Sequence, residues 1–181
     1  YVLGLSQGQV MSKEIDHIVF FSGGISSFFT AKRVVEKYGK ERTRLLFTDT
    51  LYEHEDLYEF LKEGAEHLDC ELIWITEGRN PWEVFRDERF LGNSRFDPCS
   101  KILKRLPAQR WVKKNYPDPE SCRLYLGVNH DEEHRLTRSK RYWLPYQVES
   151  PLMEPPFLGK DDMISQLREL GLLVPELYEF G

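Results

Sequence analysis

The feature that most constrains the fold is an apolar run that leads straight into two glycines and two serines. Residues 18–21 read Ile-Val-Phe-Phe, residues 22–27 read Ser-Gly-Gly-Ile-Ser-Ser, and residues 28–36 have the composition of an apolar-faced helix. The sequence therefore predicts a turn between a buried strand and a helix, with Ser26 or Ser27 near the N-cap. Because N–H groups and the helix dipole meet there, the turn is expected to bind an anion.

The loop differs from two common phosphate-binding motifs. No Gly-Lys-Ser/Thr follows the glycines, as a P-loop requires, and no third spaced glycine completes a dinucleotide fingerprint. Gly23 and Gly24 are expected to adopt left-handed backbone angles that turn successive N–H groups toward one anion. Ser22 adds a hydroxyl. An alternative is a glycine-rich turn that only caps the helix.

Strands and helices alternate along the rest of the chain, which predicts an α/β fold. Further strands are expected at 44–48, 71–76 and 123–128, and helices at 55–68, 80–90, 99–116 and 160–171, with a break near Pro107 and an aspartate capping the last helix. Residues 92–98 are predicted to form a loop and 145–156 an extended segment. This alternation favours three layers: a mostly parallel twisted sheet with helices on both faces, and ligands at the carboxyl ends of the strands.

Composition suits one domain. The chain has 181 residues, of which 40% are hydrophobic and 30% charged. Residues 12–181 are predicted to form this domain, and residues 1–11 to be a leader or other residues outside the fold. No apolar run approaches the roughly 20 residues needed to span a bilayer and no signal peptide is visible, so a cytoplasmic location is expected. A net charge of −5 argues against broad nonspecific nucleic-acid binding.

The cysteines do not suggest a structural framework. Cys70, Cys99 and Cys122 are odd in number and widely spaced. They argue against a disulfide-rich fold, and against an iron–sulfur cluster held by this chain alone, which would need four thiolates.

Four motifs occur in a recognisable order. They are Ser-Gly-Gly-Ile-Ser-Ser at 22–27, Asp-Thr followed by acidic residues at 49–56, Cys-x-x-x-Leu-Lys-x-x-Pro at 99–107, and a segment from Gly to Arg at 127–135. Together they resemble the PP-loop ATP pyrophosphatases, or adenine nucleotide alpha hydrolases, and within them the phosphoadenosine phosphosulfate reductase branch with its phage-type relatives.

The sequence departs from that branch at several positions. Leu51 stands where the branch usually has glycine, Asn129 replaces the usual arginine and Glu133 the usual serine, and Arg135 comes one position early. Residues 177–181 resemble a Leu-Tyr-x-x-Gly-Phe segment, after which relatives usually continue into a cysteine-bearing tail. The chain is therefore expected to lack that tail.

The resemblance implies an adenine nucleotide ligand, ATP or an adenosine phosphosulfate, together with Mg²⁺. Asp49, Cys99 and Lys101 are predicted to be catalytic, with Asp49 also the magnesium ligand. Ten residues are predicted to bind the nucleotide: Ser22, Gly23, Gly24, Ser26, Ser27, Thr50, Lys104, Gly127, Glu132 and Arg135.

Each of these roles has a structural alternative. Asp49 at a strand end can hold Mg²⁺ or a nucleotide hydroxyl, or it can cap the turn toward Thr50. Glu132 and Arg135 can contact phosphate and sugar, or pair with each other.

The same holds for the third motif and for the nearby aromatic residues. Lys101 and Lys104 can neutralise the nucleotide or its acceptor, although two lysines three apart on a helix more often form a solvated face. Cys99 near a helix start has the setting of a reactive thiol or of a structural one. Trp143, with Tyr142 and Tyr146, can stack on a base or pack on the sheet.

Three functions follow from the resemblance. The first is an enzyme that cleaves ATP between the α and β phosphates and adenylates an acceptor, as a transferase in sulfur metabolism or nucleic-acid modification. The second is a thiol-dependent sulfonucleotide reductase. The third is a non-catalytic nucleotide-sensing subunit. The acceptor, a small molecule or a nucleic acid, stays open, as does a homodimer or a protein partner.

Overall fold

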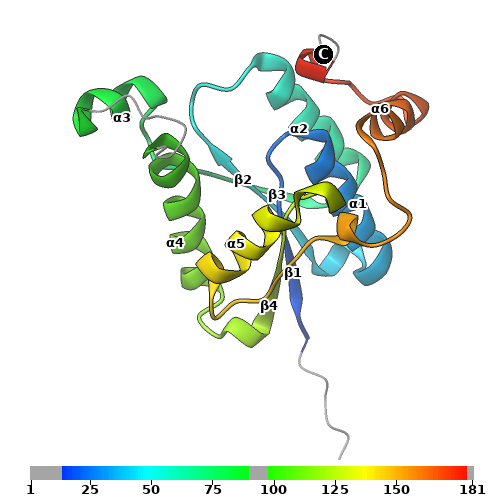
Figure 1. Cartoon of the computed structure of the whole chain (residues 1–181), viewed down its shortest axis with the longest axis horizontal. Coiled ribbons are helices and arrows are strands. Elements are labelled where there is room, and N and C mark those ends of the chain that lie inside the picture. The colour runs from blue at the N-terminus through cyan, green and yellow to red at the C-terminus, as the bar shows by residue number, and fades with distance from the viewer. Residues whose placement is uncertain (1–13, 90–97, 179–181) are drawn as a thin grey trace, which may run out of the picture.

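The computed structural model describes residues 14–89 and 98–178, and its centre is a parallel sheet (Figure 1). The strand order is β3-β2-β1-β4-β5, and every neighbouring pair is parallel. The strands are β1 (Asp16–Phe20), β2 (Thr43–Asp49), β3 (Glu71–Thr76), β4 (Cys122–Tyr125) and β5 (Val148–Glu149). The predicted α/β class is confirmed. The predicted loop at 92–98 lies almost entirely outside the described residues, as do residues 1–11.

Helices cover both faces of the sheet. The α-helices are α1 (Ile25–Tyr38), α2 (Glu55–His67), α3 (Pro81–Glu88), α4 (Leu106–Asn115), α5 (Glu133–Trp143) and α6 (Lys160–Glu169). A π-helical turn (Ser100–Arg105) precedes α4, and short 3₁₀ helices occupy Lys40–Arg42, Pro119–Ser121, His130–Glu132, Pro151–Met153 and Glu176–Tyr178. Residues of α1, α2 and α6 share one core cluster, and those of α4 and α5 share another.

The alternation of side chains along each strand builds these two cores. Val19 and Leu45 pack with Phe28 of α1 on one face, whereas Ile18 packs with Val112 of α4 on the other. All five side chains are fully buried. Because neighbouring strand residues point to opposite faces, a continuous apolar run is what a sheet covered on both sides requires.

The fifth strand was not predicted. Val148 and Glu149 pair with Leu124 and Tyr125 of β4, inside the segment expected to be merely extended. The strand has only two residues and lies among prolines, so no alternating pattern marks it. The fourth strand is correspondingly shorter than predicted and ends at Tyr125.

Two helix predictions need adjustment. The break expected near Pro107 is a change from π-helical to α-helical turns, with the proline in the first turn of α4, where a missing N–H costs little. At the last helix, Gly159 is the N-cap, and Asp162 instead accepts a hydrogen bond from the Gly159 N–H at 2.9 Å. The carboxylate therefore caps the helix from its third position, not from the cap.

His17 is a buried titratable group at the centre of the fold. The imidazole is 7% exposed, stacks on Tyr38 with ring centroids 3.8 Å apart, and places Nδ1 2.8 Å from the Tyr125 hydroxyl. Burial lowers the pKa of His17 below its ordinary 6.5, although Asp16 acts in the opposite direction.

We expect the free energy of unfolding to fall as pH decreases through 6.5, because the unfolded chain takes up a proton that the folded chain refuses. The loss levels off below the pKa of the folded state. Urea unfolding at pH 7.5 and pH 5.5 measures it, with His17→Gln as the variant whose pH dependence is smaller. An identical pH dependence in the two proteins would contradict the assignment.

Candidate functional site: the loop after the first strand

The loop between β1 and α1 has one left-handed glycine. Gly23 has φ +78°, so the prediction is confirmed there, but Gly24 has φ −85° and ψ 150°, so the prediction for Gly24 is wrong. Gly24 is the N-cap, and α1 begins at Ile25, three residues earlier than predicted. Ser27 is not the cap. Its hydroxyl donates to the Gly24 carbonyl at 2.7 Å, which closes the first turn from inside the helix.

Gly127 backs this loop from the segment that follows β4. A Cβ at Gly127 would lie 2.7 Å from the Ser27 nitrogen, 2.8 Å from the Ser26 carbonyl carbon and 2.9 Å from the Ser27 Cα. Real Cβ atoms essentially never come this close to backbone. The chain after β4 therefore touches the first turn of α1 directly, as only glycine permits. The structure thus brings together two predicted motifs that lie 100 residues apart.

An apolar slot of about 170 Å³ opens beside the loop. Its lining includes Phe20 and Ser22 at the end of β1, Trp143 of α5, and Lys104 and Arg105 at the basic end. Phe20 and Trp143 contact each other with ring centroids 5.0 Å apart. Pockets for drug-sized ligands usually measure about 300–1,000 Å³, so this slot suits one flat ring system. Trp143, predicted either to stack on a base or to pack on the sheet, lies in the core and also lines this slot.

Asp49 ends β2 and is occupied by internal donors. Oδ1 accepts from the Leu51 N–H at 2.7 Å and from the Tyr58 hydroxyl at 2.8 Å, and Oδ2 accepts from Trp74 Nε1 at 3.0 Å. Burial is the main cause, and the hydrogen bond to Asp49 the second, that raises the pKa of Tyr58 to about 12. The phenol therefore stays protonated and donates. Leu51 has φ +58°, which explains the glycine usual at that position. The contacts favour the turn-capping alternative for Asp49.

Thr50, Cys99 and Lys104 line one cavity of about 340 Å³. Glu53 joins them: its Oε1 accepts from the Thr50 hydroxyl at 2.9 Å and pairs with Lys104 Nζ at 2.9 Å. Because Lys104 also lines the apolar slot, it connects the two cavities. Lys101, in contrast, is exposed and lines neither of them.

Two predicted ligands pair with each other. Glu132 and Arg135 form an ion pair at the start of α5, with side chains 35% and 54% exposed. Neither residue lines the slot or the cavity beside Cys99. The structure thus matches the pairing alternative for both.

The other two thiols are poor nucleophiles. Burial raises the pKa of Cys122 to about 11, and burial also raises the pKa of Cys70. Cys99 Sγ faces the Pro81 carbonyl at 3.9 Å and lines the second cavity. Among the cysteines that the structure describes, Cys99 is therefore the one placed to contact a ligand in this cavity.

Sequence reasoning missed Glu53, Arg105 and Tyr178. Tyr178 comes from the far end of the chain, and its hydroxyl accepts from the Ile25 N–H at 3.3 Å. The Leu-Tyr pair at 177–178 was the only available signal, and it did not indicate a contact with the loop. A larger cavity of about 570 Å³ lies along α1 and residues 149–156 and includes none of the loop residues.

No helix within residues 14–89 and 98–178 is long and apolar enough to cross a membrane.

Known proteins share sequence or fold with this chain. The family model of the phosphoadenosine phosphosulfate reductase domain matches residues 16–178. An uncharacterised protein of Methanocaldococcus jannaschii is 26% identical over 124 residues, which cover 68% of this chain and 25% of that protein. The chain thus spans about a quarter of that relative's length.

Solved structures share the fold at low sequence identity. A phosphoadenylyl-sulfate reductase from Candida auris in a phosphate complex has a TM-score of 0.58 at 15% identity, covering 95% of this chain and 79% of that one. An NH₃-dependent NAD synthetase from Campylobacter jejuni has a TM-score of 0.53 at 16% identity, covering 92% and 68%. A U34-tRNA thiolase from Methanococcus maripaludis with its [4Fe-4S] cluster has a TM-score of 0.58 at 15% identity, covering 90% and 59%.

The family match covers almost every described residue, and it includes the loop after β1, the Asp49 turn and the Gly127 contact. The chain therefore belongs to the phosphoadenosine phosphosulfate reductase domain family, within the PP-loop adenine nucleotide alpha hydrolase superfamily.

Proposed function

We propose that the chain binds ATP and cleaves it between the α and β phosphates, transferring AMP to an acceptor. The observation that carries the proposal is the apolar slot beside Ser22, where the loop after β1 begins, at the carboxyl edge of the sheet. The base would enter the slot and pack against the side chains of Phe20 and Trp143 that line it. The phosphates would then meet the N–H groups of the loop, because the first N–H groups of a helix have no intrahelical acceptor.

The proposed chemistry is an in-line displacement at the α-phosphorus. An acceptor atom attacks, the bond to the bridging oxygen breaks, and pyrophosphate leaves with the electron pair. Backbone N–H groups from Gly23 to Ser26 and the hydroxyl of Ser22 stabilise the charge on the phosphates, and Lys104 adds a positive charge near the slot.

Magnesium accompanies ATP in this proposal and would neutralise phosphate charge. Asp49 fits poorly as its main protein ligand, since the carboxylate is 6% exposed and both oxygens already accept hydrogen bonds. We therefore assign no step to a metal held by Asp49.

A calorimetric titration tests the proposal. With Mg²⁺ present, ATP should bind, and a candidate acceptor should then release pyrophosphate. Ser22→Ala should weaken ATP binding about tenfold by removing one hydroxyl donor to a charged phosphate. Ser165→Ala, on the exposed side of α6, is the matched control.

The outcomes separate the alternatives. ATP binding that neither variant changes would remove Ser22 from the site, and absence of binding would refute the proposal. Binding without turnover on any acceptor would favour a nucleotide-sensing subunit.

A sulfonucleotide reductase is the second candidate, because Cys99 shares a cavity with Thr50 and Lys104. Selective binding of an adenosine phosphosulfate, without pyrophosphate release, would favour it. Cys99→Ser would then abolish thiol-dependent reduction while leaving binding intact. Loss of binding in that variant would instead make Cys99 a structural residue.

A further inference from the structure

The segment after α6 returns across the ends of the first two helices. We call residues 171–178 the C-terminal strap. The Leu173 N–H donates to Glu63 Oε2 at 3.0 Å, and the Glu176 N–H donates to Asp56 Oδ2 at 2.6 Å. Leu172, Leu173, Val174 and Tyr178 pack against the core cluster built on α1, α2 and α6. The strap is thus docked along its length, and in Figure 1 it lies at the upper edge, beside the start of α2.

At Tyr178 the strap reaches the start of α1, next to the loop after β1. The Ile25 N–H donates to the Tyr178 hydroxyl at 3.3 Å, and this hydroxyl lies 3.1 Å from the position of a Cβ on Gly24. Ile25 is the first residue of α1, so its N–H is one of the donors that an anion at the helix start would use. The phenol oxygen therefore stands where the loop would hold a phosphate oxygen.

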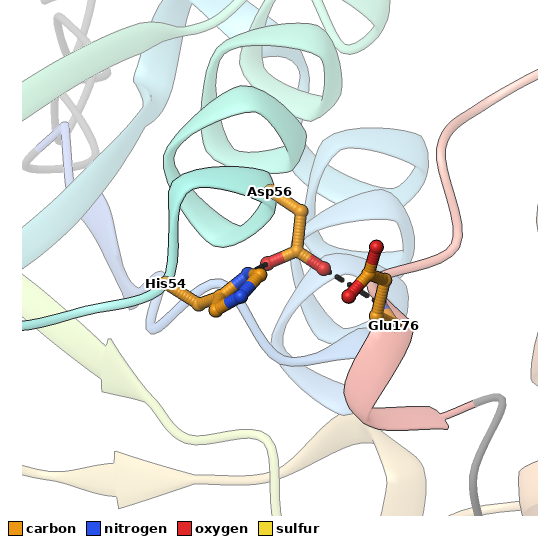
Figure 2. A group of neighbouring side chains, drawn as sticks. All are labelled: His54, Asp56 and Glu176. Carbon is orange, nitrogen blue, oxygen red and sulfur yellow. Dashed lines mark hydrogen bonds and ion pairs between the residues drawn. The ribbon is translucent and has the colours of Figure 1, made fainter.

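Asp56 holds the strap in this position. Figure 2 shows its carboxylate between His54 and Glu176: Oδ1 lies 2.6 Å from His54 Nδ1, and Oδ2 accepts from the Glu176 N–H. Burial acts to raise the pKa of Asp56, but the hydrogen bonds from Glu176 and His54 outweigh it and lower the pKa. Within the described residues these three side chains are the one group close enough to ligate a metal, yet both Asp56 oxygens already have protein donors. Asp56 thus ties the strap to the start of α2.

We propose that the C-terminal strap gates the nucleotide site: the Tyr178 hydroxyl and a phosphate compete for the Ile25 N–H, so nucleotide binding displaces the strap. The inference rests on the proposed nucleotide binding and adds a competitor built into the chain. Since only the open form accepts phosphate, the measured affinity is lower than the intrinsic affinity by the fraction of open molecules.

Tyr178→Phe tests the competition because it removes one oxygen and keeps the ring. With inorganic pyrophosphate and ATP as probes in calorimetry, the variant should bind both about three- to tenfold more tightly, the range expected for one lost hydrogen bond. Tyr116→Phe removes a hydroxyl that donates to Asp16 Oδ2 at 3.0 Å, at the other end of β1, and Tyr116 lines neither cavity. This variant is the control and should bind as the wild type does.

Any other result of this titration would contradict the proposed gate. Equal affinity would mean that the hydroxyl does not compete, and weaker binding would make Tyr178 a phosphate ligand. In both cases the proposed function stands, because the wild type still binds. If neither protein binds pyrophosphate or ATP, the loop is not an anion site, and both proposals fall.

Hydrogen exchange supplies a second measurement. Saturating pyrophosphate should accelerate exchange of the Leu173 and Glu176 amides, whose acceptors lie on α2, and leave the amides of β3 unchanged. In Tyr178→Phe the two amides should already exchange faster without ligand. Unchanged protection of both amides at saturation would show that the strap stays in place, which contradicts the gate.

Discussion

Gly127→Ala is expected to weaken nucleotide binding by at least about tenfold and to lower the free energy of unfolding by about 1–3 kcal/mol, the usual range for overpacking. The added methyl would lie 2.7–2.9 Å from backbone atoms of Ser26 and Ser27, and backbone cannot move aside as a flexible side chain does. The first turn of α1 must therefore shift, and its N–H groups lose the positions that phosphate binding needs.

Calorimetry and urea unfolding on the same preparations measure the two effects. Gly78→Ala is the matched control: Gly78 has φ +103°, so alanine there is strained, but nothing lies within 4 Å of the added methyl and the residue is outside the site. The control should lose stability and keep nucleotide affinity. Wild-type affinity in Gly127→Ala would show that the contact with α1 does not shape the loop.

Asp49→Ala is expected to lower the free energy of unfolding by about 3 kcal/mol. The substitution leaves the Leu51 N–H, the Tyr58 hydroxyl and Trp74 Nε1, all partly buried, without their acceptor. An unpaired donor costs roughly 1–3 kcal/mol where water cannot replace the lost acceptor. It also releases the turn that holds Leu51 at positive φ. Urea unfolding measures the loss.

Asp49→Asn separates the two roles considered for this carboxylate. The amide keeps one oxygen acceptor, so a turn-capping role predicts a smaller loss of stability and unchanged dependence of ATP binding on Mg²⁺. A direct magnesium ligand predicts nearly unchanged stability and a marked loss of that dependence. The second pattern would refute the capping role that the contacts favour.

Local patterns were sufficient for most of the fold. The strand at 18–21 and the helices at 55–68 and 80–90 follow from apolar spacing and capping residues, which act between neighbours in sequence. The fifth strand could not be predicted, because two residues among prolines form no pattern and β4 supplies all their pairing. The left-handed conformation predicted for Gly24 was wrong, because the sequence identifies a residue that permits such angles but not the angles that it adopts.

The residues predicted for the candidate site also fall into two groups, those that the structure brings together and those that it does not. Thr50, Cys99 and Lys104 were each singled out by motif, and the structure places all three around one cavity. Glu132 and Arg135 were singled out by the same means, but they pair with each other outside it.

The sequence by itself determined the alternation of strands and helices and the family, and it singled out the loop at 22–27. These properties reside in short segments, where backbone preference and hydrophobic spacing act locally. Only the tertiary structure decided what meets that loop: Gly127 behind it, Trp143 beside it, and Tyr178 on it. Those contacts join residues 100 to 153 positions apart, and such distances are set by how the sheet and its helices pack.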